Sequence, residues 1–172
     1  MEDCLKNDLA LERGRAEAVS IRGGRETILL VEDEAPLREI IQRMLRGLGY
    51  AVLASGSPFE AIRTAERHEG AIALLITDVV MPGINGRVLA ETLITARPEM
   101  KVLYASGYTS DACVEQGQLE PGWPLLEKPF NRDVLAKKVR ELLDSACSDA
   151  SVPSSRGSEV EYGRPLGTKR SA

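Results

Sequence analysis

Two kinds of apolar pattern alternate along the middle of the chain. Short, continuously apolar runs predict strands at 27–31, 51–55, 73–77, 101–105 and 125–126. Between them, apolar residues recur every three or four positions, which predicts helices at 36–48, 57–70, 86–96, 110–116 and from 131 onward. Because three of the strands are apolar at consecutive positions, helices should cover the sheet on both faces. The sequence therefore predicts an α/β fold, a doubly wound parallel sheet of five strands flanked by five helices.

Two of the predicted helices each have a defined apolar side. In the helix at 36–48 one apolar face, which we expect to be buried in the core, is formed by Leu37, Ile40, Ile41, Met44, Leu45 and Leu48. In the last helix Asn131 suits the N-cap, and the buried stripe comprises Leu135, Val139 and Leu142.

The two ends of the chain depart from the alternating pattern. Residues 1–25 mix acidic and basic side chains and end in Arg-Gly-Gly-Arg, which predicts a flexible N-terminal extension. Residues 147–172 are rich in Ser, Gly and Pro and carry few large apolar side chains, which predicts a disordered C-terminal tail. One folded domain is therefore expected at 26–146. We expect no output domain after it, because the remaining segment is too short for one.

Composition narrows the class of protein. Hydrophobic residues make up 43% of the chain but aromatic residues only 4%, so the core should be aliphatic. The net charge of −4 argues against a direct nucleic-acid partner. Membrane insertion and secretion are not expected, because no apolar run approaches the roughly 20 residues of a membrane span and the first residues do not resemble a signal peptide. Three scattered cysteines and one histidine favour neither a disulfide framework nor a zinc site, and a cytoplasmic location is expected.

Polar residues whose side chains can bind ions or take part in reactions follow the predicted strands. Ligands of such sheets bind outside the carboxyl ends of the strands. The residues at these ends are Glu32-Asp33-Glu34, Asp78, Ser106-Gly107 and Lys128-Pro129. Carboxylates brought together at one edge repel one another unless a cation compensates them, and Mg²⁺ is the cation that best suits a few carboxylates and water. Beside a lysine and a hydroxyl, such an ion would be placed to hold a phosphoryl group.

Each of these residues also has an ordinary explanation. An acidic residue after a strand is usually a solvated loop residue or a helix cap, and this is the interpretation favoured for Glu34. Asp78 alone would be interpreted in the same way. The coincidence of Asp78 with Asp33, Ser106 and Lys128 at the ends of three other strands favours a site instead.

Together these motifs resemble the receiver domain of two-component response regulators. The resemblance rests on ILLVEDE at 28–34, Asp78-x-x-Met81-Pro82-x-x-x-Gly86, Ala105-Ser106-Gly107 and Lys128-Pro129-Phe130. It covers about 26–145, and the details are most similar to receivers attached to hybrid sensor histidine kinases. The resemblance implies a flavodoxin-like sheet with strand order 2-1-3-4-5.

The resemblance also implies a role for each site residue. Asp78 would accept a phosphoryl group from a phosphohistidine, Ser106 would donate a hydrogen bond to it, and Lys128 would pair with it. Asp33 would hold Mg²⁺ directly and Glu32 largely through water. The implied Mg²⁺ ligands are thus Glu32, Asp33, Asp78 and the backbone carbonyl of Val80. The chain would be a phosphorylation-dependent switch rather than an enzyme, and its partner a sensor histidine kinase or a phosphotransfer protein.

Two positions affect what is expected of the switch, and one of them departs from the usual receiver pattern. Leu125 stands where receivers usually carry an aromatic residue that turns inward on activation, so we expect a weaker or different conformational output. Val80 is apolar and cannot orient an attacking water, so we expect a long-lived phosphoryl group. Two alternatives remain open: a scaffold that binds partners without phosphorylation, and a Mg²⁺-dependent phosphatase. The phosphatase would require an acid two residues after Asp78, where Val80 stands.

Overall fold

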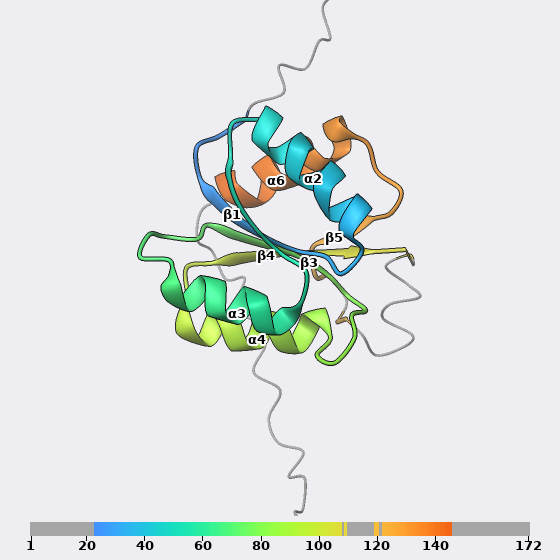
Figure 1. Cartoon of the computed structure of the whole chain (residues 1–172). Helices are drawn as coiled ribbons and strands as arrows, with labels where there is room; N and C mark the ends of the chain where they lie inside the picture. The colour runs from blue at the N-terminus through green and yellow to red at the C-terminus, as the bar shows by residue number, and fades with distance from the viewer. Residues whose placement is uncertain (1–22, 108, 110–118, 121, 146–172) are drawn as a thin grey trace, which may run out of the picture.

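The five strands in the described part of the chain join one parallel sheet. The computed structural model describes residues 23–107, 109, 119–120 and 122–145 (Figure 1). The strands are β1 (Thr27–Val31), β2 (Ala51–Ser55), β3 (Leu74–Asp78), β4 (Lys101–Ser106) and β5 (Leu125–Glu127). Their order across the sheet is β2-β1-β3-β4-β5, and every neighbouring pair is parallel. The predicted sheet and its strand order are confirmed.

Helices cover both faces of this sheet. Within the described residues they are α2 (Ala35–Gly47), α3 (Pro58–Arg67), α4 (Gly86–Ala96) and α6 (Arg132–Asp144). Figure 1 shows α2 and α6 against one face and α3 and α4 against the other. The helix expected at 110–116 lies outside the described residues, as do nearly all of the two predicted terminal segments. No helix in the described ranges combines the length and the apolar character that a membrane crossing requires.

Side-chain alternation along the strands divides the core into two layers. Leu29 and Leu75 point toward α3 and α4, whereas Ile28, Leu30 and Ile76 point toward α2 and α6. All five are almost completely buried. Because both faces of the central strands are covered, consecutive residues are apolar, which is the pattern that marked these strands in the sequence.

Asn131 caps α6 as predicted, whereas one residue of the predicted core face of α2 is exposed. Asn131 accepts a hydrogen bond from the Val134 N–H at 2.9 Å and so caps α6 as expected. In α2, Ile41 and Leu45 are buried, but Ile40 is 48% exposed. Ile40 lies about 100° around the helix from Ile41, at the rim of the apolar face, and the prediction that it belongs to the buried stripe is wrong.

The register of the strands brings their carboxyl ends to a common edge. Val31 pairs with Thr77, so that Glu32 and Asp78 follow at the same level. Asp78 in turn pairs with Ala105, next to Ser106. Ser106 pairs with Glu127, which precedes Lys128. Four segments far apart in the sequence thus deliver their polar residues to one place.

Candidate functional site

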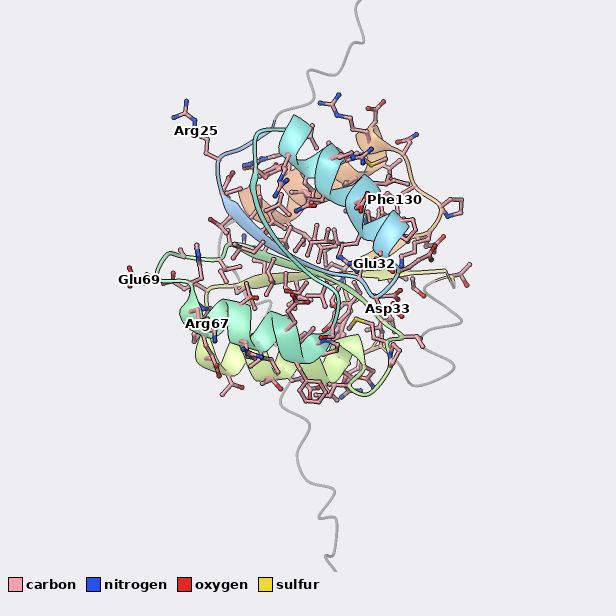
Figure 2. All side chains as sticks on the ribbon, in the orientation of Figure 1. Arg25, Glu32, Asp33, Arg67, Glu69 and Phe130 are labelled. Atoms are coloured by element: carbon pink, nitrogen blue, oxygen red, sulfur yellow. The ribbon has the colours of Figure 1, made fainter. Side chains whose placement is uncertain are left out.

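Three carboxylates gather at this edge of the sheet. One oxygen each of Glu32, Asp33 and Asp78 lies within 4.8 Å of the others. The Glu32 side chain is buried, Asp78 is partly buried, and Asp33 is exposed. Figure 2 shows Glu32 and Asp33 at this edge, with Arg67 and Glu69 at the opposite edge. The cluster therefore opens to solvent on the side of Asp33.

Lys128 bridges two of the three carboxylates. Its Nζ donates to Glu32 Oε2 and to Asp78 Oδ2, each at 2.7 Å. The Lys128 side chain is only 15% exposed, and those of Glu32 and Asp78 are 3% and 17% exposed. Because the three groups are largely removed from water, their electrostatic interactions are stronger than those of a surface ion pair.

The protonation behaviour of the cluster follows from this geometry. Burial raises the pKa of Glu32 above its ordinary value, although the hydrogen bond and charge of Lys128 act in the opposite direction. Burial acts to lower the pKa of Lys128, but the contacts with Asp78 and Glu32 outweigh it and raise this pKa. The single positive charge of Lys128 therefore faces the carboxylates of Glu32 and Asp78, with Asp33 close by, and cannot neutralise all of them.

The backbone around Asp78 fixes the direction of its side chain. The Val80 N–H donates to Asp78 Oδ1 at 3.2 Å, while Lys128 occupies Oδ2. The Gly86 N–H donates to the Val79 carbonyl at 3.0 Å, which folds the loop between β3 and α4 back onto the strand. A side chain at position 86 would not fit, because a Cβ there would lie 2.0 Å from the Asp78 carbonyl oxygen.

The remaining predicted site residues lie close to this cluster in the fold. Ser106 is buried at the end of β4, beside the strand that carries Asp78. Its carbonyl accepts a hydrogen bond from the Lys128 N–H at 2.7 Å, which joins the two segments. Val80 follows Asp78 in the loop, with a half-exposed side chain and its backbone beside the carboxylate.

The donor set suits a hard divalent cation. Mg²⁺ prefers oxygen ligands and retains several waters, and three carboxylates beside an open, solvated side of the site provide for both. The excess negative charge around Lys128 favours a second cation in the same place. The residues present therefore fit a Mg²⁺ ion held by Glu32, Asp33 and Asp78.

An aromatic stack near Leu125 was not foreseen from the sequence. Leu125 is buried and pairs with Tyr104 across the sheet. The rings of Tyr104 and Trp123 stack with their centroids 5.2 Å apart, and the Arg87 guanidinium lies 5.4 Å from the Trp123 ring centroid. The alternation of β4 places Tyr104 on the same face as Ser106, but the spacing of aromatic residues in the sequence gave no sign of the stack.

Comparison with known families identifies this arrangement. The response regulator receiver domain family matches residues 28–140. The chain belongs to this family. The receiver resemblance inferred from the motifs is therefore confirmed. The residues of the acidic edge all lie within the matched range.

Individual relatives support the assignment and refine it. The receiver is 33% identical over 136 residues to the sensor kinase CckA of Brucella abortus (strain 2308), covering 79% of this chain and 14% of that protein. The crystal structure of the receiver domain from the hybrid histidine kinase CckA has a TM-score of 0.58 and 38% identity, covering 68% of this chain and 98% of that one. The similarity to receivers of hybrid kinases is thus confirmed, and the chain spans only a small part of the kinase.

A further relative was solved with ligands. The response regulator TrrA of Thermotoga maritima, in complex with Mg²⁺-BeF, has a TM-score of 0.57 and 27% identity, covering 68% of this chain and 98% of that one. Receivers as a family are signalling switches that interact with histidine kinases. Membership therefore establishes the class of this protein, two-component signalling.

Proposed function

We propose that this receiver accepts a phosphoryl group from the phosphohistidine of a sensor histidine kinase or phosphotransfer protein, onto Asp78 and with the help of Mg²⁺. The observation that carries the proposal is the position of Lys128, which donates to Glu32 and Asp78 at 2.7 Å each. This places one cation beside the carboxylate that is to react and leaves the acidic edge short of positive charge. A phosphoryl group brings more negative charge and requires this compensation.

The transfer itself needs placement more than covalent assistance. A carboxylate oxygen of Asp78 attacks phosphorus and forms a P–O bond, while the P–N bond to the histidine breaks and its electron pair returns to the imidazole. Phosphoryl transfer passes through a loose transition state, so orientation of the attacking oxygen is decisive. The Val80 N–H and Lys128, which hold the two Asp78 oxygens, supply that orientation.

Glu32, Asp33 and Asp78, with the Val80 carbonyl, would hold the ion. When bound, Mg²⁺ neutralises charge on the phosphoryl oxygens. Ser106 and Lys128 would contact the same oxygens after transfer, so Lys128 must exchange its contact with Asp78 for one with the phosphoryl group. Because the Lys128 N–H is bonded to the Ser106 carbonyl, both loops would move together, which is how a local charge becomes a conformational switch.

The decisive test of this function is the formation of a covalent adduct. Incubated with acetyl phosphate and Mg²⁺, the intact chain should gain the mass of one phosphoryl group, and the Asp78→Asn variant should gain none. Asp133→Asn, which removes an exposed carboxylate from the first turn of α6, is the matched control and should be modified like the natural chain.

Each other outcome of this experiment points to a different function. If no adduct forms on the natural chain, a phosphorylation-independent scaffold is favoured. Continuous release of phosphate without an adduct would favour a Mg²⁺-dependent phosphatase. The apolar Val80 side chain provides no general acid for that second reaction, which is why the switch is preferred.

The cation site gives a second prediction that does not depend on phosphorylation. Mg²⁺ should raise the unfolding temperature of the natural chain, because a ligand at about 100 times its Kd adds about 2.7 kcal/mol to the free energy of unfolding. Asp33→Asn should remove most of this effect, since Asp33 is the exposed ligand of the cluster. Differential scanning calorimetry with Mg²⁺ and with EDTA measures both.

Glu34→Gln provides the control for this measurement. Glu34 is the next acidic residue, lies at the N-cap of α2 without a side-chain capping bond, and is not one of the three clustered carboxylates. Its loss changes the charge equally and should leave the Mg²⁺ effect in place. An equal loss in both variants would show that the effect reflects general charge screening rather than a site.

A further inference from the structure

Arg38 reaches back from α2 to the backbone that carries the acidic pair. Its Nη1 donates to the Glu32 carbonyl at 2.6 Å and, at a longer 3.4 Å, to the Asp33 carbonyl. The guanidinium also lies against Gly56, where an added Cβ would be 3.2 Å from Nη1. Arg38 thus sits between the segment after β1 and the segment after β2.

These contacts complete the restraint of Glu32. Its N–H donates to the Ser55 carbonyl at 3.3 Å, its carbonyl accepts from Arg38, and its side chain accepts from Lys128. Glu32 is therefore held at three points, on three different segments. Asp33 is exposed. Within the described residues, the hydrogen bond from the Arg38 side chain to the Asp33 carbonyl is the contact that restrains its position.

We propose that Arg38 is a positioning residue for the divalent cation, acting on the Glu32 and Asp33 backbone without touching the ion. The inference rests on the Mg²⁺ site of the proposed function. Groups that orient the ligands of a metal commonly influence its affinity by 10-fold to 100-fold. Both carbonyls accept from the same nitrogen, Nη1, so the position of this one atom ties the Glu32 and Asp33 backbone to α2.

The opposite effect would follow if Arg38 acted only through its charge. A cation near the site repels Mg²⁺, so its removal would then tighten binding. Positioning predicts weaker binding after the same change. The sign of the change in Kd therefore separates the two roles.

The experiment is a titration of Mg²⁺ alone into the isotope-labelled full chain, with Kd read from the NMR shift of the Val80 amide, which donates to Asp78. Arg38→Gln should raise Kd by about tenfold. Arg38→Lys keeps the charge, but its shorter side chain does not place a nitrogen at the position of Nη1, so it should also raise Kd, by a smaller factor. Arg43→Gln is the control, because Arg43 is on the same helix, is 80% exposed and pairs only with Glu39 among the described residues; its Kd should not change.

Several results would overturn the inference. A Kd unchanged in both Arg38 variants, or tightened in Arg38→Gln and unchanged in Arg38→Lys, would assign Arg38 no positioning role. Amide spectra without Mg²⁺ report whether each variant is folded, and Arg38→Lys preserves the test if Arg38→Gln unfolds. If the natural chain itself binds no Mg²⁺, the cation site of the proposed function fails, and the inference fails with it.

Discussion

Replacing Lys128 with methionine is expected to lower the free energy of unfolding by about 3 kcal/mol near neutral pH in the presence of EDTA. Methionine matches the unbranched lysine stem up to the ammonium and so preserves much of the packing of the side chain, and the loss therefore reflects mainly the charge. Without the ammonium, the buried Glu32 carboxylate and Asp78 face each other, with neither bonded to a cation. Urea denaturation measures the loss, and Mg²⁺ should recover part of it by replacing the missing charge.

The dependence of this loss on pH provides an internal check. Burial raises the pKa of Glu32, so the folded chain binds this proton more tightly than the unfolded chain does. Removal of Lys128 raises this pKa further, and the folded variant therefore gains stability as the pH falls through the range in which Glu32 is protonated. The loss should be smaller in mild acid than at neutral pH.

Two variants decide whether the charge is the cause. Lys137→Met removes a lysine that is 78% exposed and 3.9 Å from Glu141, and should change stability by less than about 1 kcal/mol. The double variant Glu32→Gln with Lys128→Met removes both members of the buried pair and should recover much of the loss. A single Lys128→Met variant as stable as the natural chain in EDTA would contradict the electrostatic account of the site.

Gly86→Ala is expected to have a comparable effect through a steric mechanism. The added methyl would lie 2.0 Å from the Asp78 carbonyl oxygen and 3.1 Å from Thr77 Oγ1. Since the nearest atoms belong to the backbone, no side-chain rotation relieves the overlap, and either the end of β3 or the start of α4 must shift. A stability loss of about 2–3 kcal/mol is expected, together with slower adduct formation on Asp78.

Gly107→Ala is the control for this variant. Gly107 follows Ser106 at the same edge of the sheet, and among the described residues no atom lies within 4 Å of a Cβ at this position. Its stability, measured by the same urea denaturation, should stay within about 0.5 kcal/mol of the natural chain. Gly86→Ala could instead prove as stable as Gly107→Ala and equally reactive with acetyl phosphate. The close approach of α4 to Asp78 would then be needed neither for stability nor for phosphorylation.

The parts of the site that could be predicted are those that depend on topology. Once 27–31 and 73–77 are interpreted as parallel strands, Glu32 and Asp78 must emerge at the same edge, whatever their side chains do. The same argument placed Ser106 and Lys128 there, and the register of the sheet confirms it.

The parts that could not be predicted depend on how individual side chains reach between segments. The bridge from Lys128 to both Glu32 and Asp78 requires particular side-chain conformations across a separation of 96 and 50 residues. In the sequence, Arg38 is one of several charged residues of a helix, and its contacts with the Glu32 and Asp33 carbonyls, which distinguish it from Arg43, are seen only in the structure. Ile40 was misassigned for a related reason, because periodicity alone does not locate the rim of a buried stripe.

Trp123 is the single tryptophan of the chain, so the long-wavelength aromatic emission of the protein has one source. Its ring lies against Tyr104 of β4 and beneath Arg87 of α4, two elements that flank the segment carrying Asp78. Quenching and spectral position of an indole depend on its immediate neighbours, and here those neighbours are contributed by separate parts of the fold. The receiver thus contains an intrinsic optical reporter of the packing between α4 and β4, and no label has to be introduced to observe it.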